Sequence, residues 1–210
     1  MTYKIAHLAD VHIKNLKYHY EYRHVFDQLY AILRKNEVDY IYIGGDIAHT
    51  KTQISPEFVQ LCSELFTNLA EIAPLYIILG NHDGNLRNKS RQDAITPIVN
   101  ALDNPNIHLL AAAGETIVTD DLAFNVLSVF DEDNWVKPSS EDRINIAFYH
   151  GCVAGVQTDA GWVMEYGDHD VSIFAGHDFA MLGDIHKTNQ ILDEDGRVRY
   201  CGSIVQQNHG

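Results

Sequence analysis

The sequence predicts an α/β fold in which two β-sheets pack as a sandwich with helices on the outer faces (αββα layers). Short apolar runs alternate with longer amphipathic runs in the first half, which is typical of α/β domains. After residue 106 the runs become short and are joined by tight, acidic turns, which predicts a mostly antiparallel second half. With 210 residues, 46% of them apolar, the chain is long enough to bury a sizeable core as one domain.

The first half predicts strands and helices in alternation. Three amphipathic runs predict helices over 20–34, 56–70 and 91–102. Ser55 before Pro56 gives the second helix an N-cap followed by proline at its first position. Apolar runs predict strands over 3–8, 40–43 and 75–79. The helical crossovers are long enough for these strands to pair in parallel.

The second half predicts shorter strands. Gly196 lies in the acidic turn 193–196 between the last two apolar runs, which is a hairpin signal. The expected strands are 107–110, 116–118, 123–129, 144–149, 171–174, 179–182, 189–192 and 198–200.

Composition excludes several classes of protein. No run approaches the ~20 apolar residues that a membrane helix requires. The sequence shows no signal-peptide pattern, and Cys62, Cys152 and Cys201 form no CxxC pair. We therefore expect a cytoplasmic protein without a disulfide framework or a thiolate zinc site. The net charge of −14 by itself argues against nucleic-acid binding.

Metal-ligand side chains follow five of the predicted strands. Functional residues of open α/β sheets gather at the carboxyl ends of strands, so five such turns can converge on one rim. A lone histidine such as His7, His19, His24 or His108 is more often an ordinary buried or surface residue, but five ordered blocks are specific. The blocks are Asp10-Val11-His12, Gly45-Asp46 with His49, Gly80-Asn81-His82-Asp83, His150-Gly151 and Gly183-Asp184-Ile185-His186.

These side chains indicate the kind of ion. Oxygen and imidazole ligands without thiolate suit Mn²⁺, Fe²⁺, Zn²⁺ or Mg²⁺. The two oxygens of a carboxylate such as Asp46 can bridge a pair of ions. Two divalent ions would more than offset Asp10, Asp46 and Asp184, so an acidic chain can still hold a locally positive pocket for phosphate.

The five blocks resemble the calcineurin-like metallophosphoesterase superfamily, whose motif is Asp-x-His, Gly-Asp, Gly-Asn-His-Asp/Glu, a lone His and Gly-x-x-His. Within it the chain is most similar to SbcD-type DNA repair nucleases, and its compact form is similar to phage-encoded members. The stretches that carry this likeness are GGDIAHT, MLGDIHK and YCGSIVQQNHG. The likeness covers essentially the whole chain.

The resemblance implies a role for each residue of the motif. One ion would be held by Asp10, His12, Asp46 and His186, and the second by Asp46, Asn81, His150 and Asp184. His82 would be the catalytic histidine that faces the scissile phosphate, and His49 would steer the DNA backbone. Asp184 is a departure, because this branch more often has histidine there. His177 is a rival ligand, although it precedes its strand.

Basic residues follow the metal motifs within nine positions. Seven of the 15 cations lie there, namely Lys14, Lys17, Lys51, Arg87, Lys89, Arg91 and Lys187. We expect them to ring the pocket and contact DNA phosphates, above all the loop 87–91. The alternative is that they are ordinary solvated loop residues.

The sequence therefore predicts a two-metal DNA phosphodiesterase with Mn²⁺ as the expected ion. The resemblance implies an SbcC-type ABC ATPase partner and a possible homodimer through the apolar run in 25–33. We expect residues 1–210 to be the nuclease domain, without the capping and ATPase-docking segments. A phosphoprotein phosphatase or a cyclic-nucleotide phosphodiesterase is an alternative, but the arginines that such phosphatases usually carry beside the Gly-Asp and Gly-Asn-His blocks are missing. A non-catalytic module is less favoured, since no ligand is lost.

Overall fold

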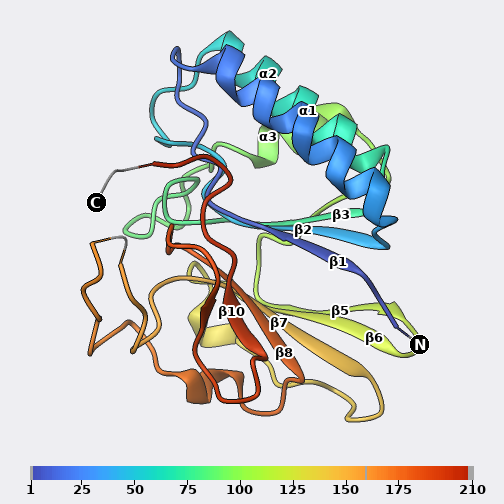
Figure 1. The fold of residues 1–210 in the computed structure, drawn as a ribbon, viewed down its shortest axis with the longest axis vertical. Helices are drawn as coiled ribbons and strands as arrows, with labels where there is room; N and C mark the ends of the chain where they lie inside the picture. Colours follow the sequence, from blue (N-terminus) through green and yellow to red (C-terminus); the bar gives the residue numbers. More distant parts are fainter. Residues whose placement is uncertain (1, 159, 208–210) are drawn as a thin grey trace.

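Two sheets pack face to face in this computed structural model, which describes residues 2–158 and 160–207. The α-helices cover the outer face of the first sheet (Figure 1). The first sheet is entirely parallel in the order β1-β2-β3-β4, as predicted for the first half. Its strands are β1 (Ile5–Leu8), β2 (Tyr40–Gly44), β3 (Leu75–Ile78) and β4 (Ile107–Leu109).

The helices are α1 (His19–Asn36), α2 (Pro56–Ala70) and α3 (Thr96–Leu102). The predicted N-cap of α2 is confirmed, because Phe58 donates its backbone N–H to the Ser55 hydroxyl at 3.1 Å. Helix α3 begins later than predicted. The Asp93 carboxylate accepts the backbone N–H groups of Ile95 and Thr96 and so holds the preceding residues out of the helix.

The second sheet has the order β5-β6-β7-β8-β10-β9. Its strands are β5 (Gly114–Thr119), β6 (Leu122–Leu127), β7 (Ile144–His150), β8 (Phe179–Gly183), β9 (Gln190–Ile191) and β10 (Val198–Tyr200). The prediction of a mostly antiparallel second half is wrong, because among the described strands of this sheet only the pairs β5–β6 and β9–β10 are antiparallel. The pairs β6–β7, β7–β8 and β8–β10 are parallel. The connections around η1 (Glu132–Asn134) and η2 (Val171–Phe174) are long enough for parallel crossovers.

Two predictions in the second half have opposite outcomes. The β9–β10 hairpin is confirmed, and Gly196 takes a positive φ of 71° in its turn. The strand predicted over 171–174 is instead the 3₁₀ turn η2. The Asp170 carboxylate accepts the Ser172 N–H at 2.7 Å and starts this turn, which buries Phe174 against the second sheet.

The apolar core has three layers. One layer lies between the helices and the first sheet, and another lies between the sheets, where the rings of Tyr42 and Phe148 stack 3.7 Å apart. The third packs η2 and neighbouring loops on the outer face of the second sheet. The run proposed for dimerisation belongs mostly to this core, since Phe26, Tyr30 and Leu33 are buried while Ile32 is exposed. The three cysteines are free.

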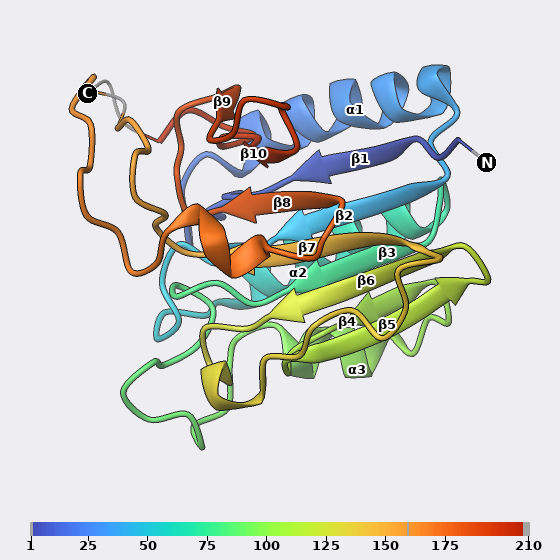
Figure 2. The same ribbon diagram turned by 90° about the horizontal axis from the view of Figure 1, so that it is seen from below.

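All strands of the first sheet and most strands of the second sheet run in one direction, with β5 and β9 as the exceptions. Figure 2 shows the arrowheads of β1, β2, β6, β7 and β8 at one edge of the sandwich. The loops that follow these strands therefore meet at that edge. Among the described residues, no helix combines the length and apolar character needed to cross a membrane.

Candidate metal centre

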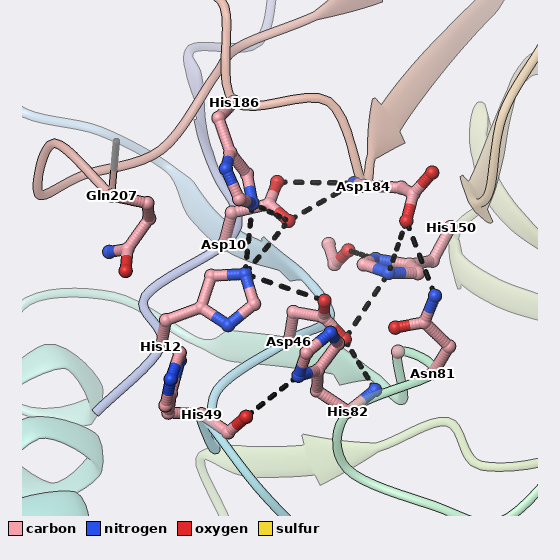
Figure 3. Close-up of polar contacts among 12 residues, drawn as sticks. Asp10, His12, Asp46, His49, Asn81, His82, His150, Asp184, His186 and Gln207 are labelled. Atoms are coloured by element: carbon pink, nitrogen blue, oxygen red, sulfur yellow. Dashed lines mark hydrogen bonds and ion pairs between the residues drawn. The ribbon is translucent and has the colours of Figure 1, made fainter. Parts of the chain in front are cut away.

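The predicted ligands converge at the edge where the strands end (Figure 3). They come from five places, namely the loops after β1, β2, β3 and β8 and the last residue of β7. The structure thus brings together residues up to 176 positions apart in the sequence, from Asp10 to His186. The assembled side chains are Asp10, His12, Asp46, His49, Asn81, His82, His150, Asp184 and His186.

The first half of the centre contains Asp10, His12 and His186. The Nε2 atoms of the two histidines lie 3.0 Å apart, and each lies 3.8 Å from Asp10 Oδ1. One ligand atom from each residue falls within 4.8 Å of the others, as a shared metal ion requires. This group matches three of the four ligands predicted for the first ion.

The second half is built around His150. Its Nδ1–H donates to the Gly44 carbonyl at 2.6 Å, which leaves Nε2 facing Asp46 at 3.3 Å and Asp184 at 3.6 Å. The Asn81 side-chain N–H donates to Asp184 Oδ1 at 3.4 Å. Within the described part of the chain, His150 Nε2 and Asn81 Oδ1 are buried without a hydrogen-bond partner. These two unpaired electron-pair donors fit a cation.

Asp46 connects the two halves. Its Oδ2 lies 3.5 Å from His12 Nε2, and its Oδ1 lies 3.3 Å from His150 Nε2. Oδ1 also accepts the backbone N–H of His82 at 2.9 Å. Two oxygens that face opposite halves are what a bridging carboxylate needs in a two-metal site.

The electrostatics of the centre favour cations. Burial raises the pKa of Asp10 to about 7. Burial alone would raise the pKa of Asp46, but His150 and His12 lower it below the usual range. Burial alone would lower the pKa of His150, but Asp46 raises it well above its ordinary value. Carboxylates this crowded and buried need nearby positive charge, which divalent ions would supply.

The backbone is strained at four of the candidate ligands. Asp10, His12 and Asp46 have φ values of 54°, 47° and 54°, and Asp184 has a φ of 99°. Such left-handed conformations are uncommon outside glycine and cluster at functional sites. Asp10 N–H donates to the Gly45 carbonyl at 3.1 Å, and His12 N–H donates to the Asp46 carbonyl at 2.9 Å. These bonds hold the loops after β1 and β2 together in the strained form.

Comparison with known proteins identifies the family. The calcineurin-like phosphoesterase family matches residues 3–181. This chain belongs to that family. The phosphoesterase is 39% identical over 221 residues to uncharacterized protein R555 of Acanthamoeba polyphaga mimivirus, a match that covers 98% of this chain and 16% of the relative. The phosphoesterase chain thus spans about a sixth of that relative's length. A search of solved structures finds the Pseudomonas putida nuclease MPE at 19% identity, with a TM-score of 0.36 over 69% of this chain and 60% of that one.

Asp83 positions the phosphoesterase loops, a role that the sequence did not reveal. Its fully buried carboxylate accepts the backbone N–H groups of Ala48 at 2.8 Å and Gly80 at 2.9 Å. It therefore ties the loop after β2 to the loop after β3. Burial raises the pKa of Asp83 to about 7. The available signal was an acidic residue next to Asn81 and His82 for which no ligand role was needed.

His82 and His49 lie side by side at the rim. The His82 Nδ1–H donates to the His49 carbonyl at 2.7 Å. The ring of His82 lies edge-on to that of His12, 4.9 Å between centroids, and one of its nitrogens lies within 4.8 Å of ligand atoms of His12 and Asp46. The rival His177 precedes β8, at the opposite end of that strand from Asp184, where its Nδ1–H donates to the Phe174 carbonyl at 3.2 Å.

The predicted DNA-contacting cations separate into groups. Lys51 and Arg87 line a cavity of about 670 Å³ together with His49 and His82, and Lys51 donates to the Asn81 carbonyl at 2.7 Å. Lys89 lines a second cavity of about 500 Å³. The other four lie outside both linings. Lys187 donates to the Gln157 side chain, Lys14 lies over the Tyr18 ring, and Lys17 and Arg91 are exposed. The cavity lined by Lys51 and Arg87 is thus the basic face of the site.

Proposed function

We propose that this phosphoesterase is a Mn²⁺-dependent DNA phosphodiesterase of SbcD type that acts in double-strand-break repair or recombination. The observation that carries the proposal is the opening of the ligand set onto a basic cavity. Asn81, His82 and His49 form the wall of this cavity, and Lys51 and Arg87 add positive charge for a phosphate backbone. The cavity is large enough for more than one phosphate of a polymer.

In the proposed reaction the metal ligands, His82 and the two basic residues of the cavity have separate roles. Two divalent ions held by the candidate ligands would supply an acidified water and neutralise charge on the phosphate. Because the His82 Nδ1–H is held by the His49 carbonyl, Nε2 is the nitrogen left to deliver a proton to the leaving oxygen. Lys51 and Arg87 orient the neighbouring phosphates.

The partner is also a proposal. An SbcC-type ABC ATPase would present DNA to the basic cavity through segments beyond this domain. The mimivirus relative is much longer than this chain, which leaves room for such segments in proteins of this kind.

Replacing His82 with alanine tests the catalytic assignment. We expect cleavage of an oligonucleotide in Mn²⁺ to fall about 10²- to 10⁴-fold, because a general acid is lost. The two ions should remain bound, because both predicted ligand sets are intact. Single-turnover cleavage and metal content by mass spectrometry are measured in parallel. His24→Ala, which removes an exposed histidine of α1, is the matched control.

Two results would contradict this proposal. Loss of metal together with activity in His82→Ala would mean that His82 is a ligand. A ligand role is geometrically possible because His82 lies close to His12 and Asp46, so the metal content decides between the two roles. Hydrolysis of phosphopeptides but not of DNA by the unchanged protein would mean that the chain is a protein phosphatase.

A further inference from the structure

A second cavity, of about 500 Å³, adjoins the half of the centre built around His150. It shares Asn81 and Leu86 with the basic cavity, so the two cavities meet at the predicted metal ligands. The described residues that distinguish it are Lys89, Glu132, Asp133, Tyr149, Asp168 and His169.

The two cavities have opposite charge. Glu132, Asp133 and Asp168 line the second cavity with Lys89 as the one lysine or arginine of the described lining, and Glu132 lies 3.8 Å from His169. Among the described residues that line the first cavity there is no carboxylate, while Lys51 and Arg87 are present. A polyanion that crosses the centre therefore meets attraction on one side and repulsion on the other.

Tyr149 supplies an independent sign of a ligand in the acidic cavity. The side chain is fully buried, and its hydroxyl has no hydrogen-bond partner within the described part of the chain. Trp135 and Phe174 contact the ring edge-on, each with its centroid 5.9 Å away, so the hydroxyl is held in place. A Cβ at position 151 would collide with this hydroxyl, and Gly151 avoids that collision. An unpaired buried hydroxyl is costly unless a bound molecule completes its hydrogen bond.

We propose that the acidic cavity binds a terminal nucleoside of the substrate, so that the enzyme cuts the phosphodiester bond next to a chain end that carries no phosphate. This inference rests on the proposed nuclease function and deepens it. Sugar hydroxyls and base amino groups can donate to Glu132, Asp133 and Asp168, while the Tyr149 hydroxyl donates to a sugar or base oxygen. A further phosphate on that side would face these three carboxylates, with Lys89 as the one lysine or arginine of the described lining to offset them.

The test compares oligonucleotides that differ only by a phosphate on one end, at the 5′ end in one pair and at the 3′ end in another. At one of the two ends, the unchanged protein in Mn²⁺ should cut the terminal bond about tenfold faster without the phosphate. The double variant Glu132→Gln/Asp133→Asn should reduce this ratio to about twofold, because the repulsion is removed. Glu141→Gln/Asp142→Asn has the same change in charge before β7, at the opposite end of that strand from His150, and should keep the ratio.

A second variant tests the nucleoside contact. Tyr149→Phe should raise the KM for the end without phosphate and leave kcat unchanged, because it removes a binding hydroxyl and no bond within the protein. Equal cleavage with and without the phosphate at both ends, or an unchanged ratio in Glu132→Gln/Asp133→Asn, would overturn the inference. An unchanged KM in Tyr149→Phe would also overturn it. Failure of the unchanged protein to cut any oligonucleotide would instead overturn the proposed function.

Discussion

Asp184 is the residue where the sequence departs from the pattern expected for the proposed SbcD-type nuclease. Its carboxylate lies 3.6 Å from His150 Nε2, and its backbone N–H donates to both oxygens of Asp10 at 3.1–3.2 Å. The side chain thus belongs to the second half of the centre, while the backbone supports the first half. A carboxylate here supplies hard oxygen in place of borderline nitrogen, which favours Mn²⁺ and Mg²⁺.

Replacing Asp184 with asparagine should lower the affinity for the second ion about 10- to 100-fold and leave the first ion bound. Asparagine suits this test better than alanine, because φ is 99° at this position and asparagine accepts positive φ more readily. Asp184→His should keep two ions and shift the preference toward Zn²⁺ or Co²⁺. Calorimetric titration with each metal measures both effects. Two ions bound to Asp184→Asn with unchanged affinity would mean that Asp184 is only a turn residue.

At the scale of single residues, a role could be predicted from the sequence for residues that belong to motifs. No role could be predicted for residues whose function depends on partners far away in the sequence. The convergence of the candidate ligands could be predicted because each lies at or after a strand end and has the atoms that a metal requires. Asp83 could not, because its carboxylate holds Ala48, which lies 35 positions away and offers only a backbone N–H. Tyr149 could not, because its significance is a missing hydrogen bond that only packing reveals.

At the scale of elements, β1 and β8 are joined across the sandwich by His7. Its Nε2–H donates to the Leu182 carbonyl at 3.1 Å, and its ring lies 5.5 Å from that of Tyr42. Burial lowers the pKa of His7 to about 4, although the bond to Leu182 opposes this change. His7 is therefore neutral in the folded protein near neutral pH.

The stability of the fold should consequently fall as the pH is lowered from about 6.5 to about 4. In this range His7 becomes protonated in the unfolded chain and stays neutral in the folded chain. His7 therefore lowers the free energy of unfolding by up to about 3 kcal/mol by pH 4. Above pH 6.5 this cost is absent. His7→Gln keeps an N–H donor without the titration and should flatten the decline by that amount. Urea unfolding at several pH values measures it, with His24→Gln as the exposed control. An equal decline in His7→Gln and the unchanged protein would contradict the assignment.

Elements were predicted correctly where local sequence signals determine the structure. They were predicted wrongly where tertiary contacts determine it. Helix α2 has its cap and proline in the sequence, so its bounds follow from Ser55 onward. The parallel pairing of β6, β7 and β8 depends on crossovers without long helices, and no local pattern marks these. The 171–174 run has the apolar content of a strand, but the Asp170 cap turns it into η2.

At the scale of the whole molecule, a net charge of −14 surrounds a small basic cavity. Only two of the predicted cations, Lys51 and Arg87, line that cavity. Few phosphates can therefore be neutralised at once, and the acidic surface repels the rest of a duplex. We expect this domain by itself to bind duplex DNA weakly and to rely on a partner for firm attachment.

The salt dependence of binding measures how many phosphates the domain contacts. Each neutralised phosphate adds about −0.9 to the slope of log K against log salt, so two cations predict a slope of about −2. Fluorescence anisotropy between about 50 and 200 mM salt, with His82→Ala to prevent cleavage, gives this slope. Adding Lys51→Gln and Arg87→Gln should bring the slope close to zero. The control changes Arg34→Gln and Lys35→Gln, in the last turn of α1, should leave the slope unchanged. Nanomolar binding with a slope several times steeper would mean that a larger basic surface engages DNA, and the two cavities could not then be the main contacts.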